Sequence, residues 1–251
     1  MDTYYQTIAP EYVRHRRVHS EVLRSLISVG ELGRESSVLD VGCGTGNYLL
    51  ALSEIVGCDC WGIDPSEAML AEAQRRLTKA RLFRAPAEQT GLPTDQYGLV
   101  FAVDVVHHLT DWPRSFRECF RILRPSGRLC LVTESAAMIR RREPHATYFP
   151  EAVEIELARY PSEVALKSEL HRAGFVDLQE LGVECHAELT DIEPYRTKVH
   201  SSLQLMSNAA FDAGIERLER DLRSGPILYT WRYLLLWGIK RSGDEGESSL
   251  P

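Results

Sequence analysis

The chain alternates between short apolar runs and longer segments in which apolar residues recur at helical spacing. Short apolar runs are typical of buried strands, and the helical spacing is typical of helices with one buried face. The predicted strands cover 38–41, 60–63, 81–84, 99–103, 128–133, 176–183 and 230–240. The predicted helices cover about 12–29, 162–173 and 207–223, and others begin near 47, 66 and 113. This alternation predicts an α/β protein with one doubly wound, mostly parallel sheet of seven strands.

Two segments depart from the alternating pattern. Residues 135–160 show no strand period, and residues 185–228 separate the last two predicted strands. We expect both to be helical cap insertions over an active site at the carboxyl ends of the strands. The rest of residues 1–241 is predicted to form one domain, and the Ser-, Gly- and acid-rich residues 242–251 are predicted to be a disordered tail.

Charge and composition narrow the classes of partner. The formal net charge is −7 and the isoelectric point is about 5.7, whereas nucleic-acid binding needs a concentrated basic face. The chain shows neither a signal peptide nor an apolar run long enough to span a bilayer. Its six cysteines lack metal-ligand spacing. We therefore expect a cytoplasmic monomer or homodimer without a nucleic-acid partner, a membrane partner or a metal site.

The most informative stretch is Val38–Leu52, VLDVGCGTGNYLLAL, which reads as a strand, a glycine turn and the start of a helix. Glycines suit a turn on which a ligand is pressed, because they have no Cβ and accept unusual backbone angles. The dinucleotide fingerprint is Gly-x-Gly-x-x-Gly and holds a pyrophosphate. Here the spacing is Gly-x-Gly-x-Gly, and the carboxylate of Asp40 would repel a pyrophosphate but attract an ammonium group.

A second acidic residue follows the second predicted strand. Asp64 lies about 20 residues beyond the glycines, where a carboxylate can accept hydrogen bonds from ribose hydroxyls. This position serves a nicotinamide cofactor and S-adenosylmethionine (SAM) equally well. Asp64 alone therefore does not discriminate between the two cofactors, whereas the glycine spacing and Asp40 disfavour the nicotinamide cofactor.

With Asp40, the glycine turn in its DVGCGTG form resembles motif I of the class I SAM-dependent methyltransferases that act on small molecules. The later string HHL…LRPSGRLCLV is similar to that family as well. The resemblance implies a Rossmann-like methyltransferase fold, SAM as cofactor and in-line transfer of a methyl group to a small-molecule acceptor. It also implies the cofactor-binding residues, which are Tyr12, Arg16, Asp40, Gly42, Cys43, Gly44, Gly46, Asp64, Pro65, Met69, Ala87, Glu88 and Val103.

One position departs from the family pattern. Relatives usually place an acidic residue after the third strand, where it meets the adenine amino group, but this chain has Pro86. Proline offers neither a carboxylate nor an N–H donor. We expect the backbone of Ala87, with Glu88 or Gln89 nearby, to take over this contact.

The candidates for catalysis lie after the fourth predicted strand. A general base is needed only if the acceptor arrives protonated, and His107 or His108 is the candidate. The residues expected in the acceptor pocket are Tyr4, Trp112, Tyr148, Tyr195 and Lys198. Two alternatives stay open: an NAD-type oxidoreductase, which the glycine spacing disfavours, and a non-catalytic SAM-binding regulatory or partner protein of the same fold.

Overall fold

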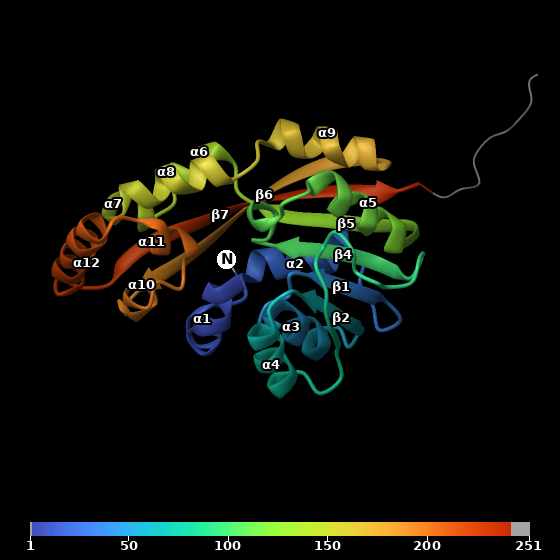
Figure 1. Cartoon of the computed structure of the whole chain (residues 1–251), viewed down its shortest axis with the longest axis horizontal. Coiled ribbons are helices and arrows are strands. Elements are labelled where there is room, and N and C mark those ends of the chain that lie inside the picture. Colours follow the sequence, from blue (N-terminus) through green and yellow to red (C-terminus); the bar gives the residue numbers. More distant parts are fainter. Residues whose placement is uncertain (1, 242–251) are drawn as a thin grey trace, which may run out of the picture.

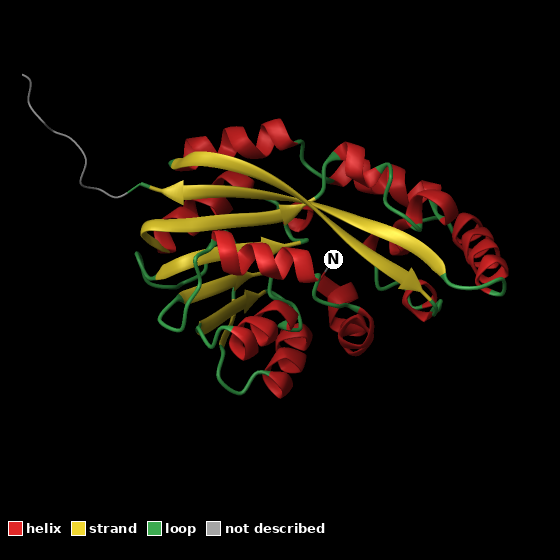
Figure 2. Cartoon of the chain, turned by 180° about the vertical axis from the view of Figure 1, so that it is seen from behind, coloured by secondary structure: helices red, strands yellow, loops and turns green. Residues whose placement is uncertain are grey.

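The computed structural model describes residues 2–241, with side chains from Tyr5 onward, so the predicted tail at 242–251 lies outside the described residues. Its centre is a seven-stranded sheet with the order β3-β2-β1-β4-β5-β7-β6 (Figures 1 and 2). The strands are β1 Ser37–Val41, β2 Asp59–Asp64, β3 Arg81–Arg84, β4 Tyr97–Val103, β5 Leu123–Thr133, β6 Phe175–Leu189 and β7 Ile227–Lys240. The first five pair in parallel, and β7 is antiparallel to both β5 and β6. The predicted fold class is thereby confirmed.

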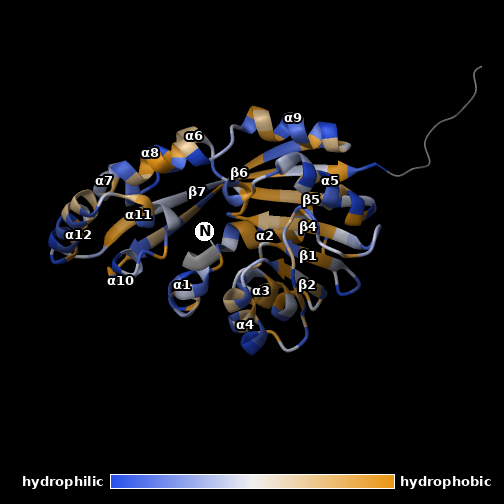
Figure 3. Ribbon diagram, in the orientation of Figure 1, coloured by the Kyte–Doolittle hydropathy of each residue, from blue (hydrophilic) through white to orange (hydrophobic). Residues whose placement is uncertain are grey.

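Helices cover both faces of this sheet. The longer helices are α1 Asp2–His15, α2 Ser20–Val29, α3 Asn47–Ile55, α4 Glu67–Arg76, α5 Trp112–Ile122, α8 Pro150–Arg159, α9 Glu163–Ala173 and α12 Asn208–Leu222. Short helices are η1 Val106–His108, α6 Ala136–Ile139, α7 His145–Tyr148, α10 Glu193–Arg196 and α11 Ser201–Leu205. Figure 3 shows apolar residues concentrated on the central strands and polar residues on the outer helix faces.

The central strands are apolar throughout because both of their faces are covered. In β1, Val38 packs into a cluster with α2 and α3, whereas its neighbour Leu39 packs into a cluster with α5 and α9. The chain runs from β1 outward to β3 and then returns to β4 beside β1. That reversal opens a crevice at the carboxyl ends of β1 and β4, where ligands of such sheets bind.

The last two strands form a long hairpin that extends past the sheet. β6 pairs with β7 from Phe175 opposite Lys240 to Leu189 opposite Ile227, but β5 pairs with β7 only as far as Leu234. The far half of the hairpin carries α10, α11 and α12, and α6 to α8 run along it (Figure 1). Of these helices, α7, α8, α10, α11 and α12 contribute to a third hydrophobic cluster, which includes Phe149. We call this assembly the cap; it comprises residues 135–160 and 190–226.

Several boundaries differ from the sequence predictions; β5, for example, begins at Leu123 and not at 128. Residues 12–29 are not one helix but the end of α1, a break at 16–19 and α2. At the break, the Arg16 carbonyl accepts a hydrogen bond from Asn47 and the His19 N–H donates to Tyr48 OH, so side chains of α3 satisfy backbone groups that a continuous helix would use. β6 and β7 are longer than predicted because they continue to pair with each other beyond the sheet. None of the helices in residues 2–241 is both long and apolar enough to cross a membrane.

Candidate functional site

The glycine turn after β1 combines three left-handed residues, with φ of +73° at Gly42, +53° at Gly44 and +76° at Gly46. A Cβ at Gly42 would lie 2.5 Å from Val105 Cγ2, and one at Gly46 would lie 2.4 Å from Leu77 Cδ1. At Gly44 the nearest atom is a Tyr12 ring carbon at 3.7 Å. The protein's own packing therefore requires glycine at the outer two positions, whereas Gly44 borders open space.

A wide cavity opens over this turn, at the carboxyl ends of β1, β2, β3 and β4. It encloses about 1010 Å³, including the solvent at its mouth, which is enough for a nucleoside-sized ligand. Of the predicted cofactor residues, its wall contains Tyr12, Gly42, Gly44, Asp64, Pro65, Met69, Ala87, Glu88 and Val103. Pro86 lies in the same wall, beside Ala87.

A smaller cavity adjoins the wide one on the side of α2 and α3, and we call it the glycine cavity. Of the predicted cofactor residues, those that line it are Tyr12, Arg16, Asp40, Gly42, Cys43, Gly44 and Val103. Gly46 lines neither cavity; it precedes α3 and packs against Leu77.

Asp40 gives the glycine cavity a preference for a cation. Its side chain is buried and accepts no hydrogen bond from the described residues. Burial, together with the nearby charge of Asp64, raises the pKa of Asp40 well above its ordinary value. A positively charged ligand group in this cavity would be stabilised by the ionised carboxylate. An ammonium group placed beside Asp40 would in turn favour the ionised form of its carboxyl, so this part of the wall fits an ammonium group.

Asp64 links the glycine turn to α4. Its Oδ2 accepts the Gly44 N–H at 2.9 Å, and its Oδ1 accepts the Ser66 N–H at 2.8 Å. Ser66 in turn caps α4 through the Met69 N–H. The carboxylate is therefore fixed at the wall of the wide cavity, in the position that suits ribose hydroxyls.

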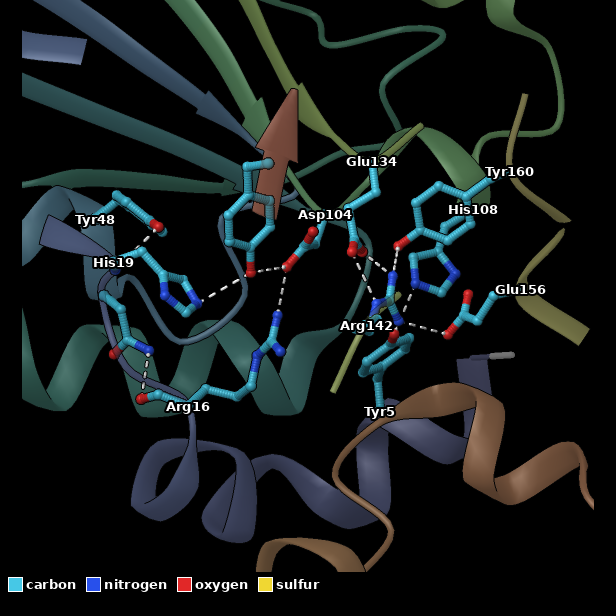
Figure 4. A network of polar contacts seen from close by, with 12 residues as sticks. Tyr5, Arg16, His19, Tyr48, Asp104, His108, Glu134, Arg142, Glu156 and Tyr160 are labelled. Atoms are coloured by element: carbon cyan, nitrogen blue, oxygen red, sulfur yellow. Dashed lines mark hydrogen bonds and ion pairs between the residues drawn. The ribbon is translucent and has the colours of Figure 1, made fainter. Parts of the chain in front are cut away.

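Arg16 meets an aspartate that the sequence analysis did not select. Arg16 Nη2 lies 2.7 Å from Oδ2 of Asp104, the first residue after β4 (Figure 4). Tyr233 OH donates to the same oxygen at 3.5 Å, and His19 Nε2 lies 3.0 Å from Tyr233 OH. Asp104 has a left-handed backbone with φ of +56°. Such strain in a non-glycine residue is concentrated at functional sites. The only sequence signal for Asp104 was its place at a strand end.

A third cavity lies under the cap, and we call it the cap cavity. It encloses about 440 Å³ with its solvent-filled opening. Its wall consists of Tyr5, Tyr12, Arg16, Asp104, His107, His108, Glu134, Arg142, Glu156, Tyr160, Val199, His200, Ser201, Trp231 and Tyr233. Nearly all of these side chains are polar or aromatic, and Val199 is the single aliphatic one.

Buried charges form one side of the cap cavity. Arg142 pairs with both carboxylate oxygens of Glu134, and its Nη1 lies 3.4 Å from Glu156 Oε1 (Figure 4). Arg142 Nη2 also donates to Tyr160 OH at 3.4 Å. The Arg140–Arg142 run resembles a solvated loop in the sequence, but the Arg142 side chain is only 6% exposed. A buried charge of this kind requires partners, and here Glu134 and Glu156 supply them.

Both candidate bases reach the cap cavity. His108 Nε2 lies 2.9 Å from Tyr5 OH and its Nδ1 lies 3.4 Å from Arg159 Nη2. Burial, then the charge of Arg159, lowers the pKa of His108 to about 4. His107 stacks on Tyr160 with ring centroids 4.1 Å apart, and burial lowers its pKa well below the ordinary value. Both imidazoles are neutral at pH 7, so they can accept a proton only weakly.

Four of the five predicted acceptor-pocket residues line none of these three cavities. Trp112 packs against the cluster under α5, and Tyr195 stacks on Phe149 within the cap. Tyr148 OH donates to Asp221 at 2.7 Å, and Lys198 Nζ lies 4.0 Å from the Phe211 ring centroid. These four side chains build the cap and the sheet instead, because their aromatic and aliphatic parts are what those elements bury. The side chain of Tyr4 lies outside the described residues.

Comparisons with known proteins agree with this geometry. Residues 39–131 match the family model described as a methyltransferase domain. The malonyl-[acyl-carrier protein] O-methyltransferase of Enterobacter lignolyticus is 29% identical over 64% of this chain and 68% of its own length. The ubiquinone biosynthesis O-methyltransferase of Bradyrhizobium diazoefficiens is 32% identical over 44% of this chain and 43% of its own. Neither match identifies the acceptor of this chain.

The fold is found in solved structures as well. The YcgJ protein of Bacillus subtilis superposes with a TM-score of 0.60 over 90% of this chain and 100% of its own, at 22% identity. The matched residues 39–131 include the glycine turn, Asp64 and the loop with both histidines. Residues 39–131 therefore match a methyltransferase domain, and the relatives and structural neighbours named here share that fold.

Proposed function

We propose that this protein transfers the methyl group of SAM to a small polar acceptor bound under the cap. The observation that carries the proposal is the meeting of cavities: the wide cavity, the glycine cavity and the cap cavity all contact Tyr12 and Asp104. Methyl transfer is an in-line displacement, so cofactor and acceptor must approach from two sides of one point. The three cavities provide such an arrangement.

The residues present fit SAM. We assign the adenosine part to the wide cavity, with Asp64 as the partner of the ribose and the backbone at Ala87 beside the adenine. The methionine part belongs in the glycine cavity, where Asp40 faces its ammonium group and Arg16 its carboxylate. SAM supplies an activated methyl group there. The chain's own contribution is to orient both reactants and exclude water between them.

The wall of the cap cavity favours a small acceptor with several hydrogen-bonding groups. Guanidinium, carboxylate, imidazole and phenol groups line it, so an acceptor with hydrogen-bonding groups can pair with the wall, whereas a long hydrocarbon tail cannot. The acidic net charge supports a small molecule rather than a nucleic acid. A cytoplasmic location and a monomeric or homodimeric state stay predictions. His107 and His108 stay the candidates for a general base, which an acceptor with an ionisable proton would need.

The two alternatives make different demands on the site. An oxidoreductase would need the glycine turn to hold a pyrophosphate, and the Gly-x-Gly-x-Gly spacing of this turn differs from the dinucleotide fingerprint. A non-catalytic SAM-binding protein would not need a second cavity beside the cofactor. The cap cavity, with its polar wall, therefore favours the enzyme.

The test is methyl transfer from labelled SAM to a panel of small polar acceptors, with protein that has first been shown to bind SAM. Transfer to any acceptor by the wild type, but not by a Gly44→Val variant purified in parallel, supports the proposal. The variant controls for contaminating enzymes because a valine side chain would occupy the space that Gly44 leaves open. If SAM binds and no acceptor is either bound or methylated, the regulatory reading replaces the enzyme.

A further inference from the structure

The junction of the three cavities is formed by two side chains with complementary properties. Among the described residues, Tyr12 and Asp104 are the two that line all three cavities. Tyr12 comes from α1 and Asp104 from the end of β4, so an N-terminal helix and the sheet meet here. Tyr12 contributes an aromatic ring and Asp104 a carboxylate.

The carboxylate of Asp104 is held in place from one side only. Its Oδ2 receives Arg16 Nη2 and Tyr233 OH, whereas its Oδ1 accepts no hydrogen bond from the described residues. The Asp104 side chain is 15% exposed, and the exposed part faces cavities rather than the outer surface. The backbone of Asp104 is left-handed, a conformation that aspartate and asparagine adopt more readily than most residues.

Aromatic rings and carboxylates together recognise cations that carry no hydrogen-bond donor, such as quaternary ammonium groups. The Arg16 guanidinium already lies 5.4 Å from the centroid of the Tyr12 ring, which shows that this ring accepts a cation nearby. A sulfonium is a cation of the same kind. It is also the one feature that distinguishes SAM from its demethylated product, S-adenosylhomocysteine, apart from the methyl group itself.

We propose that Asp104 and Tyr12 form an onium site, which binds the sulfonium of SAM at the cavity junction and favours SAM over S-adenosylhomocysteine. The inference rests on the proposed function, because the methyl group has to cross from the cofactor side to the cap cavity at this point. Arg16 fixes the Asp104 carboxylate through Oδ2 and leaves Oδ1 for the ligand. The ion pair reduces the attraction without removing it, because one guanidinium and one carboxylate at different distances from the sulfonium do not cancel.

The test is the ratio of two affinities, measured by calorimetric titration of the full chain at pH 7 with SAM and with S-adenosylhomocysteine. Asp104→Asn keeps the shape of the side chain but removes its charge, and asparagine tolerates a left-handed backbone. We expect SAM affinity to fall roughly tenfold relative to S-adenosylhomocysteine affinity, which corresponds to about 1.4 kcal/mol. Circular dichroism of the variant checks that the fold is retained.

Two matched variants make the result specific. Asp111→Asn removes the same charge from an exposed helix cap outside the cavities, where asparagine also caps well, so the ratio should not change. Asp64→Asn acts on the ribose side and should weaken both ligands by the same factor. If Asp104→Asn also weakens both ligands equally, or neither, the onium site is refuted. If the wild type binds neither ligand, the proposed function fails first, and the two failures are thereby distinguished.

Discussion

At the residue scale, the site combines groups that local sequence reveals with groups that it cannot reveal. Asp40, Asp64 and the glycines were predictable because a turn, a strand end and a fixed spacing constrain them locally. Asp104 was not selected because its meaning depends on Arg16, which lies 88 positions away in the sequence. Arg142 was not recognised because burial of a charged side chain depends on tertiary partners.

Replacing different glycines of the turn is predicted to affect different properties, namely SAM affinity at Gly44 and stability at Gly46. Gly44→Ala places a methyl group in open cavity space, so we expect weaker SAM binding with only about 1–2 kcal/mol of lost stability from the left-handed backbone. Gly46→Ala carries the same backbone cost but also overlaps Leu77. Its free energy of unfolding should therefore fall further. Calorimetric titration and urea denaturation of both variants check this, and equal losses of stability would contradict it.

At the element scale, the hairpin of β6 and β7 explains how one sheet contributes both to the cofactor crevice and to the wall of the cap cavity. Its near half completes the sheet, and its far half places Trp231 and Tyr233 in the wall of the cap cavity. The two strands were predicted, but their extension was not, because it depends on pairing between strands that lie about 40 residues apart in sequence.

Packing of α12 on α7 and α8 is predicted to hold the cap together. A Cβ at Gly214 would lie 2.5 Å from the Phe149 ring and 2.6 Å from the Tyr148 carbonyl oxygen. Gly214→Ala should therefore loosen the cap, with about 1–3 kcal/mol of overpacking partly offset by better helix propensity. We expect faster hydrogen exchange in 145–159 and 208–222 and unchanged SAM affinity. Gly182→Ala, where nothing lies within 4 Å, is the control, and equal protection in both variants would contradict the packing role.

At the scale of the whole molecule, buried histidines in the site and the cap make the stability of the folded protein depend on pH. Burial is the main cause that lowers the pKa of His19 to about 4, and of His107, His145 and His200 well below the ordinary value. These groups stay neutral in the folded protein but bind protons in the unfolded chain below about pH 6.5. The unfolded state then binds more protons, so stability decreases as pH falls.

We therefore predict that the free energy of unfolding decreases between pH 7 and pH 5. The loss is roughly 2 kcal/mol for each histidine that remains neutral in the folded state. Urea denaturation at both pH values measures it. His145→Leu should reduce the pH dependence because both ring nitrogens of His145 are buried without a hydrogen-bond partner among the described residues. His186→Gln, on an exposed stretch of β6, should leave the pH dependence unchanged. A pH-independent stability would contradict the buried neutral state.

The central claim is that the crevice at the carboxyl ends of β1 and β4 binds SAM. Calorimetric titration of the purified protein with SAM, S-adenosylhomocysteine and NAD tests it most directly. The account predicts binding of SAM and S-adenosylhomocysteine with one site per chain, and no binding of NAD. Binding of NAD without SAM, or no binding of SAM at all, would contradict the assignment of Asp40, Asp64 and the glycine turn to this cofactor.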